Sequence, residues 1–380
     1  MNPDLNRKIL RPTIAEIDLE ALRYNYRKIK TITSEKVLAV VKASAYGHGA
    51  VQVSKLLVEE GVDMLGAATI EEGIELREAG INIPIMVLGS VYPFDNYDYI
   101  IKYKLTPIVA SQDSAVALEN AAQRVSKKVF AHMKVDTGMG RIGVAGETAL
   151  ELWEKLKCSS HIIPEGVFTH LPRADEDYVY TYRQLEKFKD LIARLSPAPS
   201  IVHASNTAGL LNFKESHLNM VRPGLALYGL YPDNVSKNKL NLQPALKFKS
   251  TVIFVKNVEK GTPVSYGGTW KAPKKTQIAT VCVGYADGYR RDLTNKADVL
   301  IRGTRCPVVG RVCMDMIMVD VSSLKNICVG EEVVLMGRAG KEEVSAEELA
   351  SICGTINYEI TSGISGRVPR IFKGKDDGVS

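Results

Sequence analysis

The sequence lacks the features that mark several specialised classes of protein. No uninterrupted apolar stretch approaches the roughly 18 residues of a transmembrane helix. The net charge of +6 is spread along the chain without a run of basic residues, so a nucleic-acid partner is not expected. The start of the chain, MNPDLNRKILRPT, has no apolar signal core. We therefore expect a cytoplasmic protein without a membrane partner.

The cysteines show no metal-binding pattern. The sequence contains six of them, none in a C-x-x-C pair, and the spacing of zinc ligands is absent. Most have apolar neighbours in the last third of the chain. We expect buried, free thiols in a reducing compartment and no metal site.

The length predicts more than one domain. The chain has 380 residues, whereas one average domain has about 100–200. Hydrophobic residues make up 45% and charged residues 24%, a balance that excludes a disordered or fibrous protein. Two domains, one of them of barrel size, are therefore expected.

Short apolar runs alternate with amphipathic stretches through the first part of the chain. The helical stretches are 18–31, 50–60, 70–80, 111–124, 147–157 and 176–194. The strand candidates are 37–42, 63–68, 84–88, 106–110, 128–135, 163–169, 200–204 and 219–222. Eight such units predict a (β/α)8 barrel, because a doubly wound open sheet rarely repeats the unit so often.

The pattern of apolar residues changes near residue 240. The later segments are β-branched and alternating, and only 345–353 has helical spacing. We therefore predict a barrel over residues 11–240 and a mostly β domain over 241–380, with residues 1–10 as candidates for the second domain. The fold class is α/β, a barrel followed by a mostly β C-terminal domain.

Charged residues end several barrel strands, where barrel enzymes place their active sites. Lys42 follows four apolar residues, and a desolvated lysine suits Schiff-base chemistry because only the neutral amine attacks a carbonyl. Lys134 and Arg141 lie at and after the end of the fifth strand, and a guanidinium binds a carboxylate through two hydrogen bonds. The structural alternatives are a lysine that extends to solvent and a charged loop with a local ion pair.

The last three barrel strands end in further polar residues. His170 ends the sixth strand, where a structural, hydrogen-bonded histidine is the alternative reading. Asn206 and Thr207 follow the seventh strand, and Arg222 ends the eighth. Barrels commonly bind phosphate at these last two strand ends. Together with Lys42, this placement indicates pyridoxal phosphate.

Seven motifs, in order along the chain, resemble those of the bacterial alanine racemases. They are VKASAYGHG, KVDTGMGRIG, VRPGLALYG, SYGGTW, VGYADGYRR, GRVCMDMIMVD and RVPR. The resemblance extends from about Arg11 to Arg370, and VKASAYGHG with VRPGLALYG is highly specific. It implies a homodimer, arranged head to tail, with active sites at the subunit interface and pyridoxal phosphate bound to Lys42.

The resemblance also implies roles for individual residues. Lys42 is expected to be one catalytic base, and Tyr266 of the partner subunit the other. Two bases on opposite faces of the α-carbon are what racemisation requires. Arg222 is expected to face the pyridine nitrogen, His203 to support Arg222, and His170 to link Arg222 with Tyr266.

The remaining expected roles concern phosphate and substrate. The residues expected to bind phosphate by the resemblance are Tyr46, Thr207, Gly224, Leu225 and Tyr358. Arg141 and the backbone of Met314 are expected to bind the substrate carboxylate, with Tyr285 near the pocket wall. Lys134 matches a position that the family often carbamylates. The chain departs from the usual pattern at Ser44, where Asn is usual, at Thr207, where Ser is usual, and in the stretch HLPRAD.

The resemblance implies interconversion of L- and D-alanine, supplying D-alanine for peptidoglycan. A broader racemase that acts on serine or lysine is an alternative, because a few pocket residues decide specificity. A pyridoxal-phosphate decarboxylase would not be expected to carry SYGGTW. A non-catalytic pyridoxal-phosphate homeostasis protein would resemble the barrel alone.

Overall fold

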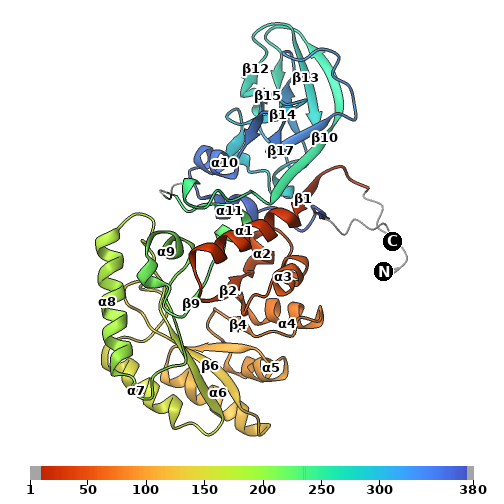
Figure 1. Cartoon of the computed structure of the whole chain (residues 1–380). Coiled ribbons are helices and arrows are strands. Elements are labelled where there is room, and N and C mark those ends of the chain that lie inside the picture. The colour runs from red at the N-terminus through yellow and green to blue at the C-terminus, as the bar shows by residue number, and fades with distance from the viewer. Residues whose placement is uncertain (1–9, 234, 236, 375–380) are drawn as a thin grey trace. The chain divides into compact units, whose positions relative to one another are not determined.

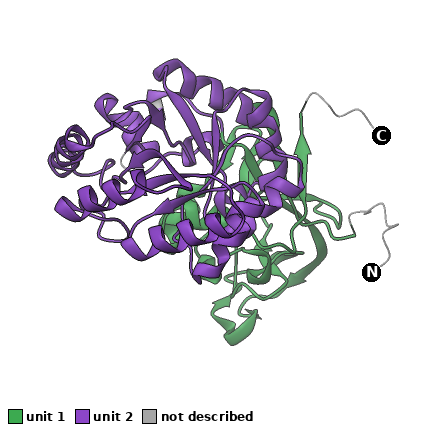
Figure 2. Cartoon of the chain, turned by 90° about the horizontal axis from the view of Figure 1, so that it is seen from below, with its two compact units in different colours: residues 1–20, 244–380 green, residues 21–243 purple. Residues whose placement is uncertain are grey.

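The computed structural model describes residues 10–233, 235 and 237–374, and the chain divides into two compact units. Unit 2 comprises residues 21–243, and unit 1 comprises residues 1–20 and 244–380 (Figure 2). The change of sequence pattern near residue 240 thus lies close to the second boundary between the units, at residues 243 and 244. Residues 1–9, which were candidates for the second domain, lie outside the described residues.

Unit 2 contains a closed barrel of eight parallel strands, which confirms the predicted fold class (Figure 1). Neighbouring strands follow the order of the chain, and the last strand closes on the first through pairs such as Lys36 with Met220. The strands are β2 (Lys36–Val40), β3 (Met64–Ala67), β4 (Ile85–Val87), β5 (Thr106–Val109), β6 (Val129–Lys134), β7 (Ile162–Phe168), β8 (Ile201–His203) and β9 (Met220–Val221).

Helices connect the barrel strands. They are α1 (Leu19–Ile32), α2 (Lys42–Tyr46), α3 (Ala50–Glu59), α4 (Ile70–Glu78), α5 (Tyr97–Lys102), α6 (Gln112–Arg124), α7 (Gly146–Lys157), α8 (Tyr178–Arg194) and α9 (Thr207–Asn212). Every residue of β3, β4 and β5 is buried, as expected for parallel strands covered on both faces. Side-chain caps fix several helix starts. Thr69 and Glu72, for example, form a capping box on α4.

Unit 1 is built on one mostly antiparallel sheet. Its main path runs β15-β14-β17-β10-β1-β19, and β13, β16 and β18 branch from it. The elements are β1 (Ile14–Asp18), β10 (Leu246–Val258), β11 (Pro263–Val264), β12 (Trp270–Lys271), β13 (Thr276–Val281), β14 (Asp298–Ile301), β15 (Thr304–Pro307), β16 (Ile317–Asp320), β17 (Glu332–Ala339), β18 (Glu342–Val344), α10 (Ala346–Cys353), α11 (Asn357–Ser362) and β19 (Arg370–Lys373).

The predicted start of the barrel at residue 11 was wrong. Residues 14–18 form β1, which pairs antiparallel with β10 and parallel with β19 in the sheet of unit 1. The segment IAEID alternates, so that Ala15 and Ile17 are fully buried while their neighbours are partly exposed. This alternation suits a strand of an antiparallel sheet better than a fully covered barrel strand.

The six cysteines are free thiols, but their predicted burial is only partly correct. Cys306 is buried, whereas Cys158 and Cys328 are exposed. Within the part of the chain that the structure describes, no group of three His, Cys, Asp or Glu side chains is arranged to hold a metal. No helix among these residues has the length and apolar character needed to cross a membrane.

Candidate active site

Lys42 lies at the end of the first barrel strand, immediately before an unusual turn. Residues 43–46 all have φ values of 52–53°, which makes α2 one turn of left-handed backbone. Left-handed helical backbone costs roughly 1–2 kcal/mol per residue when the residue carries a Cβ. Glu72 braces the turn, because its Oε1 accepts a hydrogen bond of 2.6 Å from Ala43 N. The strained turn therefore fixes the point at which the Lys42 side chain leaves the barrel.

The surroundings of Lys42 favour its neutral amine. Burial lowers the pKa of Lys42, and the positive charge of Arg141 lowers this pKa further, while Glu72 acts in the opposite direction. Lys42 itself is half-buried and Arg141 is exposed. A lower pKa raises the fraction of the neutral amine, whose lone pair is required for attack on a carbonyl.

Lys134 ends β6 and is buried. Its Nζ donates a hydrogen bond of 2.9 Å to Val135 O and lies 4.9 Å from the centroid of the Phe168 ring. Burial lowers the pKa of Lys134 to about 7, and the charge of Arg222 contributes. Neutral and charged forms of this amine therefore coexist near neutral pH.

Arg222 follows β9 and is held by three acceptors. Its Nη1 lies 3.0 Å from His203 Nδ1, and its Nη2 donates to Thr169 O at 2.7 Å and to Ala204 O at 2.9 Å. The guanidinium carbon lies 5.2 Å from the centroid of the Phe168 ring. Burial lowers the pKa of Arg222 to about 9, so that Arg222 remains charged at neutral pH.

A guanidinium has five N–H donors. The three hydrogen bonds described above use three of the donors of Arg222. Both hydrogens of Nη2 are bound to backbone carbonyls. Among the described residues, Nε–H and the second hydrogen of Nη1 have no acceptor. Arg222 therefore has donors available for a ligand atom.

The predicted site residue His170 and the neighbouring Asp136 differ in their roles. Burial and the charges of Arg222 and Lys134 lower the pKa of His170 well below its usual range, so its imidazole is neutral. No hydrogen bond joins Arg222 to His170 among the described residues. Asp136, by contrast, organises the loop after β6. Both of its carboxylate oxygens accept backbone N–H donors, including Gly138 N at 2.8 Å.

The ends of β8 and β9 form a narrow cradle. Thr207 Oγ1 accepts hydrogen bonds from Gly224 N at 3.1 Å and from Ala226 N at 3.4 Å, so the hydroxyl hydrogen remains available to a ligand. Asn206 Oδ1 caps α9 by accepting from Gly209 N. Leu225, the residue after Gly224, is buried.

Only glycine fits at position 224, because a side chain there would collide with Tyr46. A Cβ at this position would lie 2.5 Å from Tyr46 Oη, closer than non-bonded atoms approach. The Tyr46 ring in turn packs against that of Tyr228, with centroids 5.0 Å apart. The glycine therefore keeps the backbone open beside a phenol hydroxyl.

In unit 1, three of the predicted residues lie on turns that are joined by one loop. Tyr285 N donates to Cys313 O at 3.0 Å, which ties Tyr285 to the loop that bears Met314. Ser265, next to Tyr266, donates from Oγ to Arg311 O at 2.7 Å. Side chains of Tyr266, Tyr285 and Met314 are all exposed in the single chain, Tyr266 by 70%.

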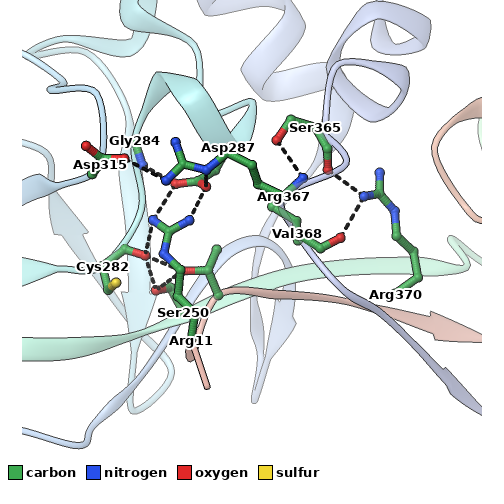
Figure 3. Close-up of polar contacts among 11 residues, drawn as sticks. Arg11, Ser250, Cys282, Gly284, Asp287, Asp315, Ser365, Arg367, Val368 and Arg370 are labelled. Atoms are coloured by element: carbon green, nitrogen blue, oxygen red, sulfur yellow. Dashed lines mark hydrogen bonds and ion pairs between the residues drawn. The ribbon is translucent and has the colours of Figure 1, made fainter. Parts of the chain in front are cut away.

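A charged network braces these turns (Figure 3). Asp287, which is fully buried, accepts from both terminal nitrogens of Arg11 and from Gly284 N at 2.9 Å. Arg367 lies with Nε 3.7 Å from Asp287 and donates from Nη2 to Asp315 at 2.7 Å. The network thus connects the turn that bears Tyr285 with the loop that bears Met314. The remaining predicted residue, Tyr358, lies half-buried in α11.

Sequence reasoning missed three residues that the barrel places beside Arg222 and Lys134. Phe168 packs its ring against both cations and stacks on His203, with centroids 4.7 Å apart. His132 and Glu165 continue the contacts of His203 on the side away from Arg222. The available signals were a histidine two residues before Lys134 and a carboxylate within the apolar β7.

Fold and site together define a class of two-domain enzyme, in which a (β/α)8 barrel with a desolvated lysine precedes a β domain. Residues 17–232 match the family model described as alanine racemase, N-terminal domain, and residues 245–372 match alanine racemase, C-terminal domain. The chain therefore belongs to the alanine racemase family, a family of isomerases.

Individual relatives agree with this assignment. The alanine racemase of Halothermothrix orenii is 46% identical over 98% of this chain and 100% of its own length. That of Symbiobacterium thermophilum is 47% identical over 96% of this chain and 98% of its own. The solved alanine racemase of Clostridium difficile 630 superimposes with a TM-score of 0.92 at 44% identity, covering 98% of both chains.

Proposed function

We propose that the protein interconverts L- and D-alanine with pyridoxal phosphate held on Lys42, as a homodimer whose active sites combine residues of both subunits. The observation that carries the proposal is the desolvated Lys42 amine, fixed by a left-handed turn at the mouth of the barrel. The charges of Lys134, Arg141 and Arg222 act on the same region. Such a site suits a ligand that carries both phosphate and carboxylate groups.

The residues at the barrel mouth fit pyridoxal phosphate. Its aldehyde requires a neutral amine, and the lowered pKa of Lys42 favours that form. Its phosphate fits the cradle where a Cβ on Gly224 would meet Tyr46 and where the Thr207 hydroxyl has a hydrogen to donate. Asn206 Oδ1 supports the cradle by capping α9, and Leu225 and Tyr358 are further candidates for the phosphate. The Arg222 donors without an acceptor suit the pyridine nitrogen.

When bound, the cofactor accepts the electron pair that the α-carbon releases on losing its proton. Protein side chains carry out the proton transfers and hold the reacting groups in position. We assign Lys42 Nζ to hold or deliver the proton on one face of the α-carbon, and Oη of Tyr266 from the partner subunit to do so on the other. Arg222 would keep its own proton and so leave the pyridine nitrogen unprotonated, which would make the cofactor a weaker electron acceptor. His203 supports Arg222. Because His170 makes no hydrogen bond to Arg222 among the described residues, we assign His170 only to the contact with Tyr266 of the partner subunit.

Arg141 is assigned to the substrate carboxylate, together with the backbone of Met314, and Tyr285 to the pocket wall. Lys134 is a candidate for carbamylation, because its pKa of about 7 leaves much of the amine neutral. The neutral nitrogen would attack CO2 and lose a proton, giving a carbamate anion that attracts the Arg141 guanidinium.

Three of the assigned groups lie on one loop system of unit 1 and are exposed in the single chain: Tyr266, Tyr285 and Met314. Aromatic and methionine side chains exposed together are typical of a surface that a partner covers. This supports a second copy as the partner, bringing its barrel mouth to these residues. We further propose a cytoplasmic enzyme that supplies D-alanine for peptidoglycan.

A chiral assay of the purified protein over several L-amino acids tests the proposed reaction. We expect D-alanine to form from L-alanine faster than D-serine or D-lysine forms from its enantiomer. Equal rates with serine or lysine would favour the broader racemase, and no racemisation in the presence of bound cofactor would contradict the proposal. The match to the alanine racemase C-terminal domain argues against the homeostasis protein, which resembles the barrel alone.

A second experiment tests the role of Lys42 directly. We expect the purified protein to be yellow, and borohydride reduction to fix the cofactor to Lys42. Peptide mapping identifies the modified residue. A cofactor adduct on any other lysine would contradict the assignment.

A further inference from the structure

A chain of side-chain contacts leads away from Arg222 through the barrel. Arg222 Nη1 lies 3.0 Å from His203 Nδ1, and His203 Nε2 lies 2.8 Å from His132 Nδ1. His132 Nε2 lies 3.3 Å from Oε2 of Glu165. Both histidines are fully buried, whereas the Glu165 side chain is 28% exposed. The chain thus joins a buried cation to a carboxylate in contact with solvent.

The chemistry of the two ends fixes the direction of every hydrogen bond between them. A guanidinium only donates, so His203 Nδ1 has to accept and carries no hydrogen. A neutral His203 then carries its hydrogen on Nε2 and donates to His132 Nδ1. The hydrogen of a neutral His132 is therefore on Nε2, where Glu165 accepts it. If the hydrogen bonds ran in the opposite direction, His203 Nδ1 would carry a hydrogen that points at the N–H of Arg222, and two donors form no hydrogen bond.

The surroundings of His203 favour its neutral form. Burial and the positive charge of Arg222 lower the pKa of His203 well below its usual range. At the other end, the hydrogen bond from His132 lowers the pKa of Glu165, so Glu165 is the acceptor in its ionised form.

The backbone is shaped to bring Glu165 and His132 together. Along the β6–β7 pair, Ala131 faces Pro164 and His132 faces Gly166, which leaves Glu165 as the extra residue of a bulge. A bulge redirects a side chain that regular pairing would place elsewhere. Gly166 also makes room, because a Cβ there would lie 2.5 Å from Nδ1 and Cε1 of His132.

We propose that Glu165 and His132 are positioning residues which, through the hydrogen bonds of His203, hold Arg222 in one orientation. The chain occupies one hydrogen of Nη1 and so leaves the other, with Nε–H, for a ligand. That this ligand is the pyridine nitrogen rests on the proposed function. The direction of the hydrogen bonds does not.

The first experiment reads the tautomers of the intact protein by NMR after selective 15N labelling of its six histidines. We expect His132 and His203 to be neutral and protonated at Nε2 at neutral pH. The same spectrum contains controls of both kinds. His217 Nε2 faces Leu210 O at 3.0 Å and is expected to be protonated, while His48 Nδ1 faces Ala45 O at 3.0 Å and is expected to carry the hydrogen there.

The second experiment compares two substitutions of Glu165. Glu165→Gln keeps an oxygen that accepts from His132, so we expect the tautomers to persist and kcat/KM to change by less than about twofold. Glu165→Leu removes the acceptor, and we expect kcat to fall about tenfold with KM little changed and the His203 signals to shift. Glu119→Leu is the matched control, because it removes a carboxylate 2.8 Å from His161 Nδ1 and should leave kcat and His203 unchanged.

Each outcome decides a separate point. A His203 that is charged or protonated at Nδ1, or a His132 protonated at Nδ1, would overturn the chain. The expected tautomers with an unchanged kcat and unchanged His203 signals in Glu165→Leu would overturn the action of Glu165 on Arg222. The expected tautomers in a protein that racemises no amino acid would refute the proposed function and leave the chain intact.

Discussion

At the scale of single residues, the left-handed turn after Lys42 has a testable energetic consequence. Ser44 has φ of 53° and an exposed side chain, and Asn tolerates this conformation better than other residues with a Cβ. We expect Ser44→Asn to raise the free energy of unfolding by about 0.5–1 kcal/mol. Ser44→Ala, which lacks this tolerance, should give no gain. Equal stabilities of both variants in thermal unfolding would contradict the strain.

Lys134 should make stability depend on pH. Its pKa is about 7 in the folded protein and 10.5 when unperturbed, so between these values the unfolded state binds the additional proton. The free energy of unfolding should therefore rise with pH across that window, by up to about 1.4 kcal/mol per pH unit from this group. Lys134→Met should remove this contribution. Denaturant unfolding from pH 7 to 10 in CO2-depleted buffer measures it, and identical slopes for both proteins would refute the shift.

The sequence predicted the charged residues at the strand ends but not the chain behind Arg222. Lys42 and Arg222 are visible because a cation that ends an apolar run has to be used or exposed. Glu165 was not identified, since its meeting with His132 depends on a bulge that shifts the pairing by one residue. Likewise, the left-handed φ values after Lys42 fall on alanine, serine and tyrosine, which do not predict them.

At the scale of elements, the network around Asp287 should hold the turns of unit 1 in place. We expect Asp287→Asn to lower the free energy of unfolding by about 3 kcal/mol, because the Arg11 charge then lacks its buried partner. Arg338→Gln, which alters an exposed pair with Glu343, is the control and should cost less than about 1 kcal/mol. Urea unfolding measures both, and equal losses would contradict a structural role for the network.

Elements with strong periodicity were predicted well, and short ones were not. β10 (Leu246–Val258) lies in the part of the chain predicted to be mostly β, because its alternation continues over many residues. β1 and β19 were missed as strands of unit 1, since they are short and pair with each other from opposite ends of the sequence. Such pairing leaves no local signal, so only the folded sheet reveals it.

At the scale of the whole molecule, the two proposed bases should be separable by isotope exchange. With Tyr266→Phe, we expect racemisation of L-alanine to fall by about 100-fold or more, while cofactor absorbance is retained. Lys42 should still exchange the α-proton of D-alanine with D2O, whereas exchange from L-alanine should be lost. NMR of both enantiomers follows the exchange. Equal loss from both enantiomers would contradict one base per face.

The most direct test of the account mixes two inactive variants, Lys42→Ala and Tyr266→Phe, and isolates the heterodimer. If each site takes its amine from one subunit and its phenol from the other, one of the two sites is intact. We predict that the purified heterodimer regains about half of the wild-type rate of D-alanine formation from L-alanine. A heterodimer verified by mass spectrometry that stays as inactive as its parents would contradict the shared active site.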